Sequence, residues 1–457
     1  METGALDPKA WQPVLHDSFH PPSVHRLVAR EVIPVSPDLH RSFNVSVPDW
    51  RWPLWASALD AVAGEATKGK AKSGWWTEKL FGDDWGRPGP PEFGMIQVGP
   101  KKSRSAIMDG GAVIAYERGG EKSRLVLSVH PVMMAHRISL VGTDAQREDA
   151  ERFFRDIDGW IAANNFFKGQ KIDPFGEFLE LDDVDEADLV LPAALKEDLF
   201  RNVAQMIERA PEYARFGIPA KRGIIMAGPP GCGKTLSMRV LAKRLPCSFI
   251  WVTPRHLEKL NGLSHVYDFA REIAPSVVLL EDADAFGIDR RLGQFSPVLG
   301  ELLGILDGVV ANKGVVTILS SNFAEVLDSA LTRRPGRFDV KLNFNPPAGP
   351  EAFEMLRRTI ERRKVVLSGD PESLRKAAFA LAEQGASGAH VVEVANYASM
   401  LAVERGRGKG VRLTLDRQDI EDATKRVLAS LGAEADTEKA LATEGVLKWG
   451  GWPAERR

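Results

Sequence analysis

The feature that most constrains this sequence is a glycine-rich segment, residues 228–235, between a strand pattern and a helical pattern. The apolar run Gly223 to Ala227 suits a short strand, and Leu236 to Leu245 has apolar residues at helical spacing. Glycines let consecutive backbone N–H groups turn toward phosphate oxygens, and a helix N-terminus adds partial positive charge. A strand, a glycine-rich turn and a helix in this order predict a loop that binds a nucleoside triphosphate.

The side chains that follow the loop glycines predict how the nucleotide and its metal are held. Lys234 can reach the β- and γ-phosphates, and the Thr235 hydroxyl can bind Mg²⁺. The expected cofactors are therefore a nucleoside triphosphate and Mg²⁺. The predicted nucleotide-binding residues are Gly228, Pro229, Pro230, Gly231, Cys232, Gly233, Lys234, Thr235 and Leu236.

Two further strand patterns end in polar residues that complete such a site. The apolar run Val277 to Leu280 ends in Glu281 and Asp282, and Val315 to Leu319 leads to Asn322. Beside a phosphate loop, one carboxylate holds the metal and the other orients the attacking water. We assign Glu281 as the second ligand of Mg²⁺, after Thr235. Asp282 is assigned to orient the attacking water. Asn322 is expected to fix that water or to contact the γ-phosphate.

Composition limits the class of protein. The chain has 457 residues, a net charge of −2 and two cysteines. A near-neutral charge gives no general attraction to nucleic acid or anionic membranes, and two cysteines exclude a disulfide framework. The apolar run Leu125 to Val141 carries His130 and Arg137, which suits buried strands better than a membrane span. No secretory signal pattern is present, so we expect a cytoplasmic protein with no membrane partner.

The first 175 residues differ in pattern from the rest and predict an α+β N-terminal domain that recognises a client or partner. They hold eight of the 11 tryptophans, which we interpret mainly as core residues. One of the adjacent Trp75 and Trp76 is expected to be exposed, because neighbouring strand residues face opposite sides. The predicted strands are Met95 to Val98, Ala112 to Tyr116 and Arg124 to Val129, and the predicted helix is Asp144 to Asn164.

The remaining residues predict a nucleotide-binding domain and a lid. The acidic stretch Asp182 to Asp188 is interpreted as a solvated linker, and a helix from Leu195 to Ala210, ended by Pro211, leads into the core. Strands then alternate with helices, which is typical of a doubly wound parallel sheet. The predicted strands are Ile224 to Ala227, Ser248 to Val252, Val277 to Leu280 and Val315 to Leu319. The sequence thus predicts an α/β fold with domains at 1–175 (N-terminal), 176–345 (large nucleotide-binding), 346–430 (small helical lid) and 431–457 (a loosely held tail).

Together these motifs resemble the AAA family of ring ATPases over residues 190–430. Gly228 to Thr235 resembles its Walker A loop, Leu302 to Gly308 its Leu-Leu-x-x-Leu-Asp-Gly element, and Asn322 its sensor 1 position. Ser387 to Ala389, with the helix from His390 to Arg405, resembles its sensor 2 region. The resemblance implies ATP as the nucleotide, hydrolysis to ADP and phosphate, and a P-loop doubly wound sheet with a small helical lid.

The resemblance also implies that the site is shared between subunits. Leu327 to Asp339 resembles the second region of homology, in which Arg334 and Arg337 fall on the arginine-finger positions. Thr332-Arg333 stands where many relatives have a single residue, so Arg333 is an alternative to Arg334 as the first finger. Finger arginines stabilise charge on a neighbour's nucleotide, which implies a homo-oligomeric ring of six or seven subunits.

Within the family, the order Glu281-Asp282 is similar to one subgroup. Most members have Asp-Glu there, whereas Glu-Asp is typical of the mitochondrial chaperone that assembles the respiratory bc complex. The sequence shows no counterpart of the transmembrane helix that anchors that chaperone, so its location does not carry over.

Two functions are compatible with these features. The first is a ring ATPase that remodels or moves an unknown protein client. The second is an ATPase switch or motor that regulates a partner effector or nucleic acid, as in prokaryotic defence modules. Leu260 replaces the aromatic residue of the segment that resembles a pore loop, which favours moving a folded client over threading. The N-terminal region has no basic stripe interleaved with aromatics, which disfavours nucleic acid.

Overall fold

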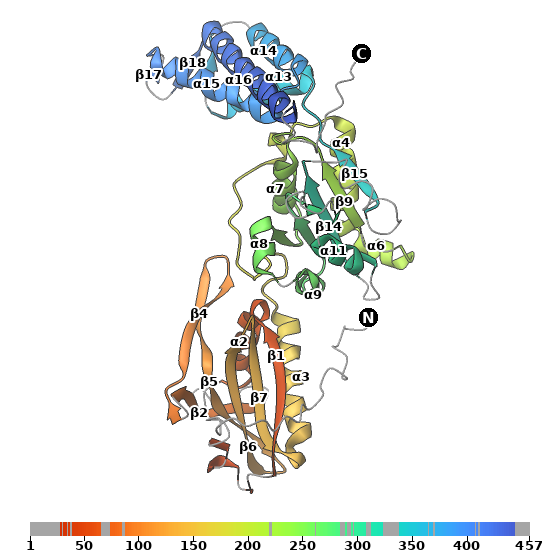
Figure 1. Cartoon of the computed structure of the whole chain (residues 1–457). Coiled ribbons are helices and arrows are strands. Elements are labelled where there is room, and N and C mark those ends of the chain that lie inside the picture. Colours follow the sequence, from red (N-terminus) through yellow and green to blue (C-terminus); the bar gives the residue numbers. More distant parts are fainter. Residues whose placement is uncertain are drawn as a thin grey trace. The chain divides into compact units, whose positions relative to one another are not determined.

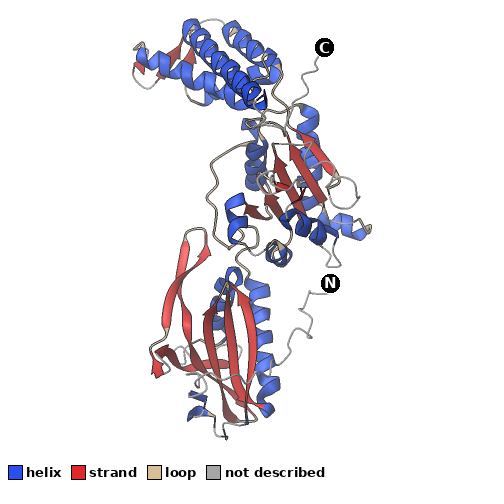
Figure 2. Cartoon of the chain, in the orientation of Figure 1, coloured by secondary structure: helices blue, strands red, loops and turns tan. Residues whose placement is uncertain are grey.

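The chain forms two compact units, Met1–Glu180 and Leu181–Arg457, in a computed structural model. Figure 1 names the elements of each unit, and Figure 2 distinguishes their helices from their strands. No helix in the described part of the chain is both long and apolar enough to cross a membrane. The structure describes residues 28, 29, 31–33, 35, 36, 39–64, 74–84, 87–218, 222–260, 262–283, 288, 289, 294, 295, 297–307, 312–322, 338–363, 365–368, 371–406, 408, 409 and 412–443.

The N-terminal unit is built on an antiparallel sheet. Its strands follow the order β1-β7-β6-β5-β2-β3, and β4 also pairs with β5. Each strand expected from the sequence lies inside a longer one, because the pairing continues on both sides of each predicted run. The strands are β1 His40–Pro48, β2 Trp75–Asp84, β3 Arg87–Gly89, β4 Glu92–Gly99, β5 Lys102–Arg118, β6 Glu121–Val132 and β7 Ala135–Thr143. The short strand β8 Lys171–Ile172 comes later in the chain and is not part of this sheet.

Helices α2 (Trp52–Val62) and α3 (Arg147–Asn164) pack against each other and against this sheet. The expected helix is confirmed, with a short 3-10 turn over Asp144–Gln146 before α3. Phe153, Ile157 and Ile161 of α3 are buried at helical spacing, so one face of the helix closes the core.

Tryptophans fill much of that core. Trp75 is fully buried and contacts the rings of Tyr116 and Phe153. Trp76 is half-buried, and the Lys122 ammonium lies 5.8 Å from the centre of its ring. The adjacent pair thus faces opposite sides of β2, although Trp76 is less exposed than expected. Trp50, Trp52 and Trp55 are also buried, which confirms their interpretation as core residues.

The second unit contains a parallel sheet in the order β15-β9-β14-β11-β10. Every residue of β10, β11 and β14 is buried, because helices cover both faces of a doubly wound sheet. The expected strands are confirmed, whereas β15 was not foreseen. The strands are β9 Arg222–Ala227, β10 Ser248–Val252, β11 Ser276–Leu280, β14 Val315–Ser321 and β15 Val340–Asn343, with a separate small hairpin of β12 Ile288–Asp289 and β13 Gln294–Phe295.

The expected single helix ended by Pro211 is wrong. Three short helices replace it, and Pro211 lies in the first turn of the third, where its missing N–H is tolerated. The helices of this part are α4 Ala193–Asn202, α5 Ala204–Glu208, α6 Ala210–Arg215, α7 Lys234–Arg244, α8 Pro254–Lys259, α9 Ser264–Glu272 and α11 Pro297–Asp307.

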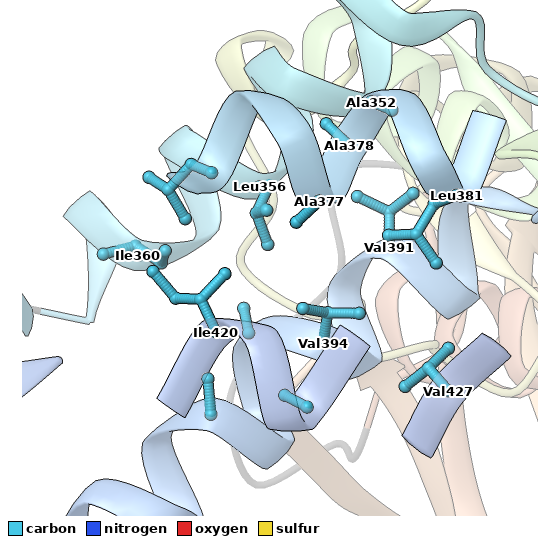
Figure 3. Close-up of a cluster of buried hydrophobic side chains, with 14 of the residues drawn as sticks. Ala352, Leu356, Ile360, Ala377, Ala378, Leu381, Val391, Val394, Ile420 and Val427 are labelled. Atoms are coloured by element: carbon cyan, nitrogen blue, oxygen red, sulfur yellow. The ribbon is translucent and has the colours of Figure 1, made fainter. Parts of the chain in front are cut away.

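The helical lid has its own hydrophobic core (Figure 3). Leu356, Leu381, Val391 and Val427 come from four different helices and are all buried. Helix α16 continues through Gly432 to Thr443, past the residue at which the tail was expected to begin. One glycine costs a helix about 1 kcal/mol, too little to end it among alanines and glutamates. The helices are α13 Gly349–Arg362, α14 Glu372–Glu383, α15 Gly388–Glu404 and α16 Arg417–Thr443, beside a small sheet of β16 Val365–Leu367, β17 Gly408–Lys409 and β18 Arg412–Leu415.

The acidic stretch is not a freely solvated linker, so that interpretation is wrong. Its carboxylates pair with basic side chains of α7 and of the lid helix α13, which a local pattern of acids could not reveal. Such exposed pairs contribute little individually, but together they fix the path of the segment. The pairs are Asp182–Arg239 (2.6 Å), Asp183–Lys243 (2.6 Å), Glu186–Arg244 (2.9 Å) and Asp188–Arg362.

Candidate nucleotide site

The glycine-rich loop joins β9 to α7, and its three glycines, Gly228, Gly231 and Gly233, all have positive φ. Gly228 has φ 151°, and a Cβ there would lie 2.0 Å from the carbonyl oxygen of Phe344. Gly231 has φ 74°, and a Cβ there would lie 2.8 Å from Ser387 Oγ. Side chains are therefore excluded at both positions, by backbone conformation and by close neighbours.

Lys234 begins α7, and its ammonium lies at the mouth of this loop. Its Nζ donates to the carbonyl oxygens of Gly228 (2.6 Å) and Pro229 (2.9 Å) and to Asn322 Oδ1 (2.8 Å). The side chain is only 6% exposed. Since an ammonium has three donors and phosphate oxygens are strong acceptors, a phosphate could exchange for these oxygens.

Thr235 and Glu281 meet between α7 and the end of β11. The Thr235 hydroxyl donates to Glu281 Oε1 at 2.7 Å, and the indole N–H of Trp251 donates to Glu281 Oε2 at 2.9 Å. The Glu281 backbone N–H also bonds the Val252 carbonyl, which extends the strand pairing by one residue. Both oxygens of this carboxylate are therefore held in place.

Asp282 has a left-handed backbone, with φ 49°. Its N–H donates to Ser320 Oγ at 3.1 Å, and the next N–H, of Ala283, donates to the Ser320 carbonyl at 2.8 Å. Aspartate tolerates this conformation better than longer side chains do. In the order Glu281-Asp282 the shorter acid therefore occupies the left-handed position, and the longer Glu281 precedes it.

Asn322 connects the phosphate loop to the acids. Its Oδ1 accepts from Lys234, and its Nδ2 lies 3.5 Å from Asp282 Oδ1. β14, which Asn322 follows, pairs with both β9 and β11, so their carboxyl ends meet at one edge of the sheet. Ligands of doubly wound sheets bind at this edge.

The structure thus brings together the polar residues that the sequence singled out. Cys232 is buried within the loop, and this burial raises the pKa of its thiol, while nearby Lys234 acts in the opposite direction. The three candidate finger arginines lie outside the described residues: Arg333, Arg334 and Arg337.

Several residues at this site are not among the predicted nucleotide-binding, catalytic or metal residues, although the segment that begins at Ser387 resembles the sensor 2 region. Ser387, the N-cap of α15, lies against Gly231, and the Ala389 N–H donates to the Gly231 carbonyl at 3.1 Å. The lid therefore touches the phosphate loop directly. Trp251 and Ser320 lie in apolar strand patterns that favour the core. The available signal was that a tryptophan near a strand end carries a polar N–H that needs a partner.

Comparison with known proteins agrees with this geometry. Residues 224–346 match the ATPase family associated with various cellular activities (AAA). A 26S proteasome regulatory subunit 8 homolog of Schizosaccharomyces pombe is 31% identical over 274 residues, covering 56% of this chain and 65% of that protein. The ATP-dependent zinc metalloprotease FtsH 1 of Salinibacter ruber is 31% identical over 241 residues, covering 50% and 34%.

The chain spans less than two thirds of the length of these relatives. The matched region nevertheless contains the phosphate loop, both strand-end acids and Asn322. Sequence match, sheet order and site geometry agree, and we conclude that residues 224–346 form an AAA-type ATPase domain.

Proposed function

We propose that this chain hydrolyses ATP to ADP and phosphate and uses the energy to remodel or move a protein client. The observation that carries the proposal is the convergence of three strand ends. There Lys234 bonds Asn322, and Thr235 bonds Glu281. Membership of residues 224–346 in an ATPase family supports ATP as the nucleotide.

Each polar residue receives one role in this proposal. The loop N–H groups and Lys234 bind the phosphates, and Asp282 orients and deprotonates the attacking water. Asn322 holds that water in line, because its amide lies between Lys234 and Asp282. Glu281 is assigned to the metal, since its carboxylate adjoins Thr235.

The residues present fit Mg²⁺. Thr235 and Glu281 offer oxygen donors 2.7 Å apart beside the phosphate loop. Mg²⁺ prefers oxygen ligands and commonly takes one or two from the protein, with phosphates and water supplying the rest. When bound, Mg²⁺ supplies positive charge that neutralises phosphate oxygens.

We extend the proposal to a homo-oligomeric ring of six or seven subunits in which Arg334 and Arg337 act on the neighbour's nucleotide. Arg333 remains the alternative first finger. The family resemblance supports this assembly, because finger arginines contribute only across a subunit boundary.

Complementation tests the ring. Arg334→Ala should leave nucleotide affinity unchanged and lower turnover by roughly 10³-fold. Mixing it with Lys234→Ala should restore activity, because one protomer supplies an intact pocket and its neighbour an intact arginine. Turnover should also rise with protein concentration. A wild-type rate per protomer that is independent of concentration, with no recovery on mixing, would contradict the shared site. Arg333→Ala decides which arginine acts first.

The state of the loop after α8 supports a client that is moved without threading. Leu260 is only 8% exposed, so its side chain does not project as a gripping residue. The neighbouring turn is held by Glu301 of α11, whose Oε1 accepts from the N–H groups of Leu263 and Ser264. A nucleic-acid motor is the alternative. DNA that stimulates ATP hydrolysis at low salt but not at high salt would favour it.

Two finer assignments belong to the same proposal. The order Glu281-Asp282 supports placement in the subgroup of the chaperone that assembles the mitochondrial bc complex. We also propose a cytoplasmic location, which fractionation of cells expressing the tagged protein would test.

A further inference from the structure

We propose that Trp251 is a positioning residue that holds Glu281 in the orientation needed to bind Mg²⁺ together with Thr235. The inference rests on the ATPase function proposed above. It adds to the phosphate loop and the strand-end acids a tryptophan that the sequence pattern favours as plain core.

The strand register fixes the distance between Trp251 and Glu281. β10 and β11 run parallel, with Trp251 opposite Leu279 and Val252 opposite Leu280. The Glu281 N–H then bonds the Val252 carbonyl at 2.9 Å. The Glu281 backbone is therefore tied to the strand that carries Trp251, so the indole meets the carboxylate at a fixed separation.

The hydrogen bonds divide the two carboxylate oxygens between two partners. Oε2 accepts the indole N–H of Trp251 at 2.9 Å, and Oε1 accepts the Thr235 hydroxyl at 2.7 Å. An indole N–H only donates, so it attracts the ionised acid and offers nothing to a cation. Trp251 therefore binds Oε2 of Glu281 and leaves Oε1 directed at Thr235.

Side-chain length makes this support necessary. Glutamate has one more rotatable bond than aspartate, so a Glu281 carboxylate can point in more directions. Trp251 is only 7% exposed and its ring is fixed in the core. Its hydrogen bond therefore selects one direction for the Glu281 carboxylate. Partners that orient a metal ligand from outside typically change metal affinity by 10- to 100-fold.

Trp251→Phe tests the role, because phenylalanine keeps an apolar ring and removes the N–H. The Mg²⁺ concentration for half-maximal ATP hydrolysis should rise about 10- to 100-fold. Binding of a fluorescent ATP analogue, titrated with Mg²⁺, should show the same shift without relying on turnover. Affinity for that analogue in EDTA should stay at the wild-type value.

Trp55→Phe is the matched control. Trp55 is also buried, with 1% exposed against 7% for Trp251, and its indole nitrogen bonds no other residue that the structure describes. This variant should leave the Mg²⁺ dependence unchanged. A wild-type Mg²⁺ dependence in Trp251→Phe, by both measurements, would overturn the inference.

Glu281→Asp separates positioning from packing. An aspartate is one methylene shorter and should not reach both partners, so Trp251→Phe should have little further effect in that background. Full additivity of the two substitutions would show that Trp251 acts independently of Glu281 and would overturn the role.

A spectroscopic test covers the case in which Trp251→Phe does not fold. The protein has 11 tryptophans, so ¹⁵N-labelled indoles give at most 11 side-chain N–H resonances. Glu281→Asp should shift one of them. If all resonances keep their wild-type positions, the inference fails. A wild-type protein without Mg²⁺-dependent ATP turnover would instead contradict the proposed function.

Discussion

The two units of this chain use their buried polar groups differently. In the second unit, Lys234 bonds Asn322 at the carboxyl end of a parallel sheet. In the N-terminal unit, the Tyr116 hydroxyl donates to Asp149 Oδ2 at 2.8 Å, between the sheet and helix α3. The first contact lies at an open sheet edge where a ligand can exchange for a partner, whereas the second is enclosed by the fold.

A second pair of contacts shows the same contrast. The Trp75 indole N–H donates to Asp156 at 2.8 Å, again from sheet to α3. The Thr235 hydroxyl donates to Glu281, where the start of α7 meets the end of β11. We infer that the polar network of the N-terminal unit stabilises its fold, and that the network of the second unit binds and reacts. Substitutions in the two networks should therefore change different measurements.

The largest expected effect is on nucleotide binding. Lys234→Ala removes the ammonium that would exchange its present acceptors for phosphate oxygens. Loss of one or two such charged bonds, each contributing about 1.5–3 kcal/mol, should weaken ATP binding by roughly 100-fold or more. Lys243→Ala is the matched control on the same helix, since Lys243 is exposed and pairs with Asp183. Titration with a fluorescent ATP analogue measures both. Equal losses in the two variants would contradict the assignment of Lys234.

The next effect is on the stability of the N-terminal unit. Trp75→Ala should lower its free energy of unfolding by about 3–5 kcal/mol, because it leaves a cavity in the core. Trp76→Ala should cost much less, since Trp76 is only half-buried. Eight of the 11 tryptophans lie in residues 1–175, so intrinsic fluorescence reports mainly on this unit. If ATP binding by Trp75→Ala is lost in the same unfolding transition that tryptophan fluorescence reports, the two units do not behave separately, and the distinction between them fails.

The smallest effect concerns pH. Burial lowers the pKa of His136, which stacks on Trp52, while the nearby Asp49 partly opposes this change. The folded unit therefore favours neutral His136. Its contribution to stability is fully present above the ordinary histidine pKa of about 6.5 and is lost as pH falls from there toward the lowered pKa of the folded unit. Melting temperature followed by tryptophan fluorescence should decrease over that range.

His136→Phe keeps the stacked ring and should flatten this dependence in the N-terminal unit. His265 in the second unit also has a pKa lowered by burial, so that unit should keep its own loss of stability in acid. An unchanged fluorescence profile in His136→Phe would show that another group titrates.

Much of the second unit was predictable because its signals are local. β10 coincides with the predicted strand, and β9, β11 and β14 extend it by one or two residues. A buried parallel strand is a continuous apolar run, and the loop glycines and strand-end acids are adjacent in sequence to those runs. The N-terminal sheet was less predictable. Its 17-residue strand β5 mixes exposed and buried stretches, and no short window reveals such a pattern.

The sequence by itself determined that this chain has a glycine-rich loop of the phosphate-binding type and a strand that ends in two carboxylates, because each of these patterns is set by chemistry within a few residues. Only the tertiary structure decided that Trp251 holds Glu281, that Asp282 turns left-handed against Ser320, and that the lid touches Gly231. Each of these contacts joins segments at least 30 residues apart in the chain. Their pairing depends on strand order and register, which the pattern of single segments does not specify.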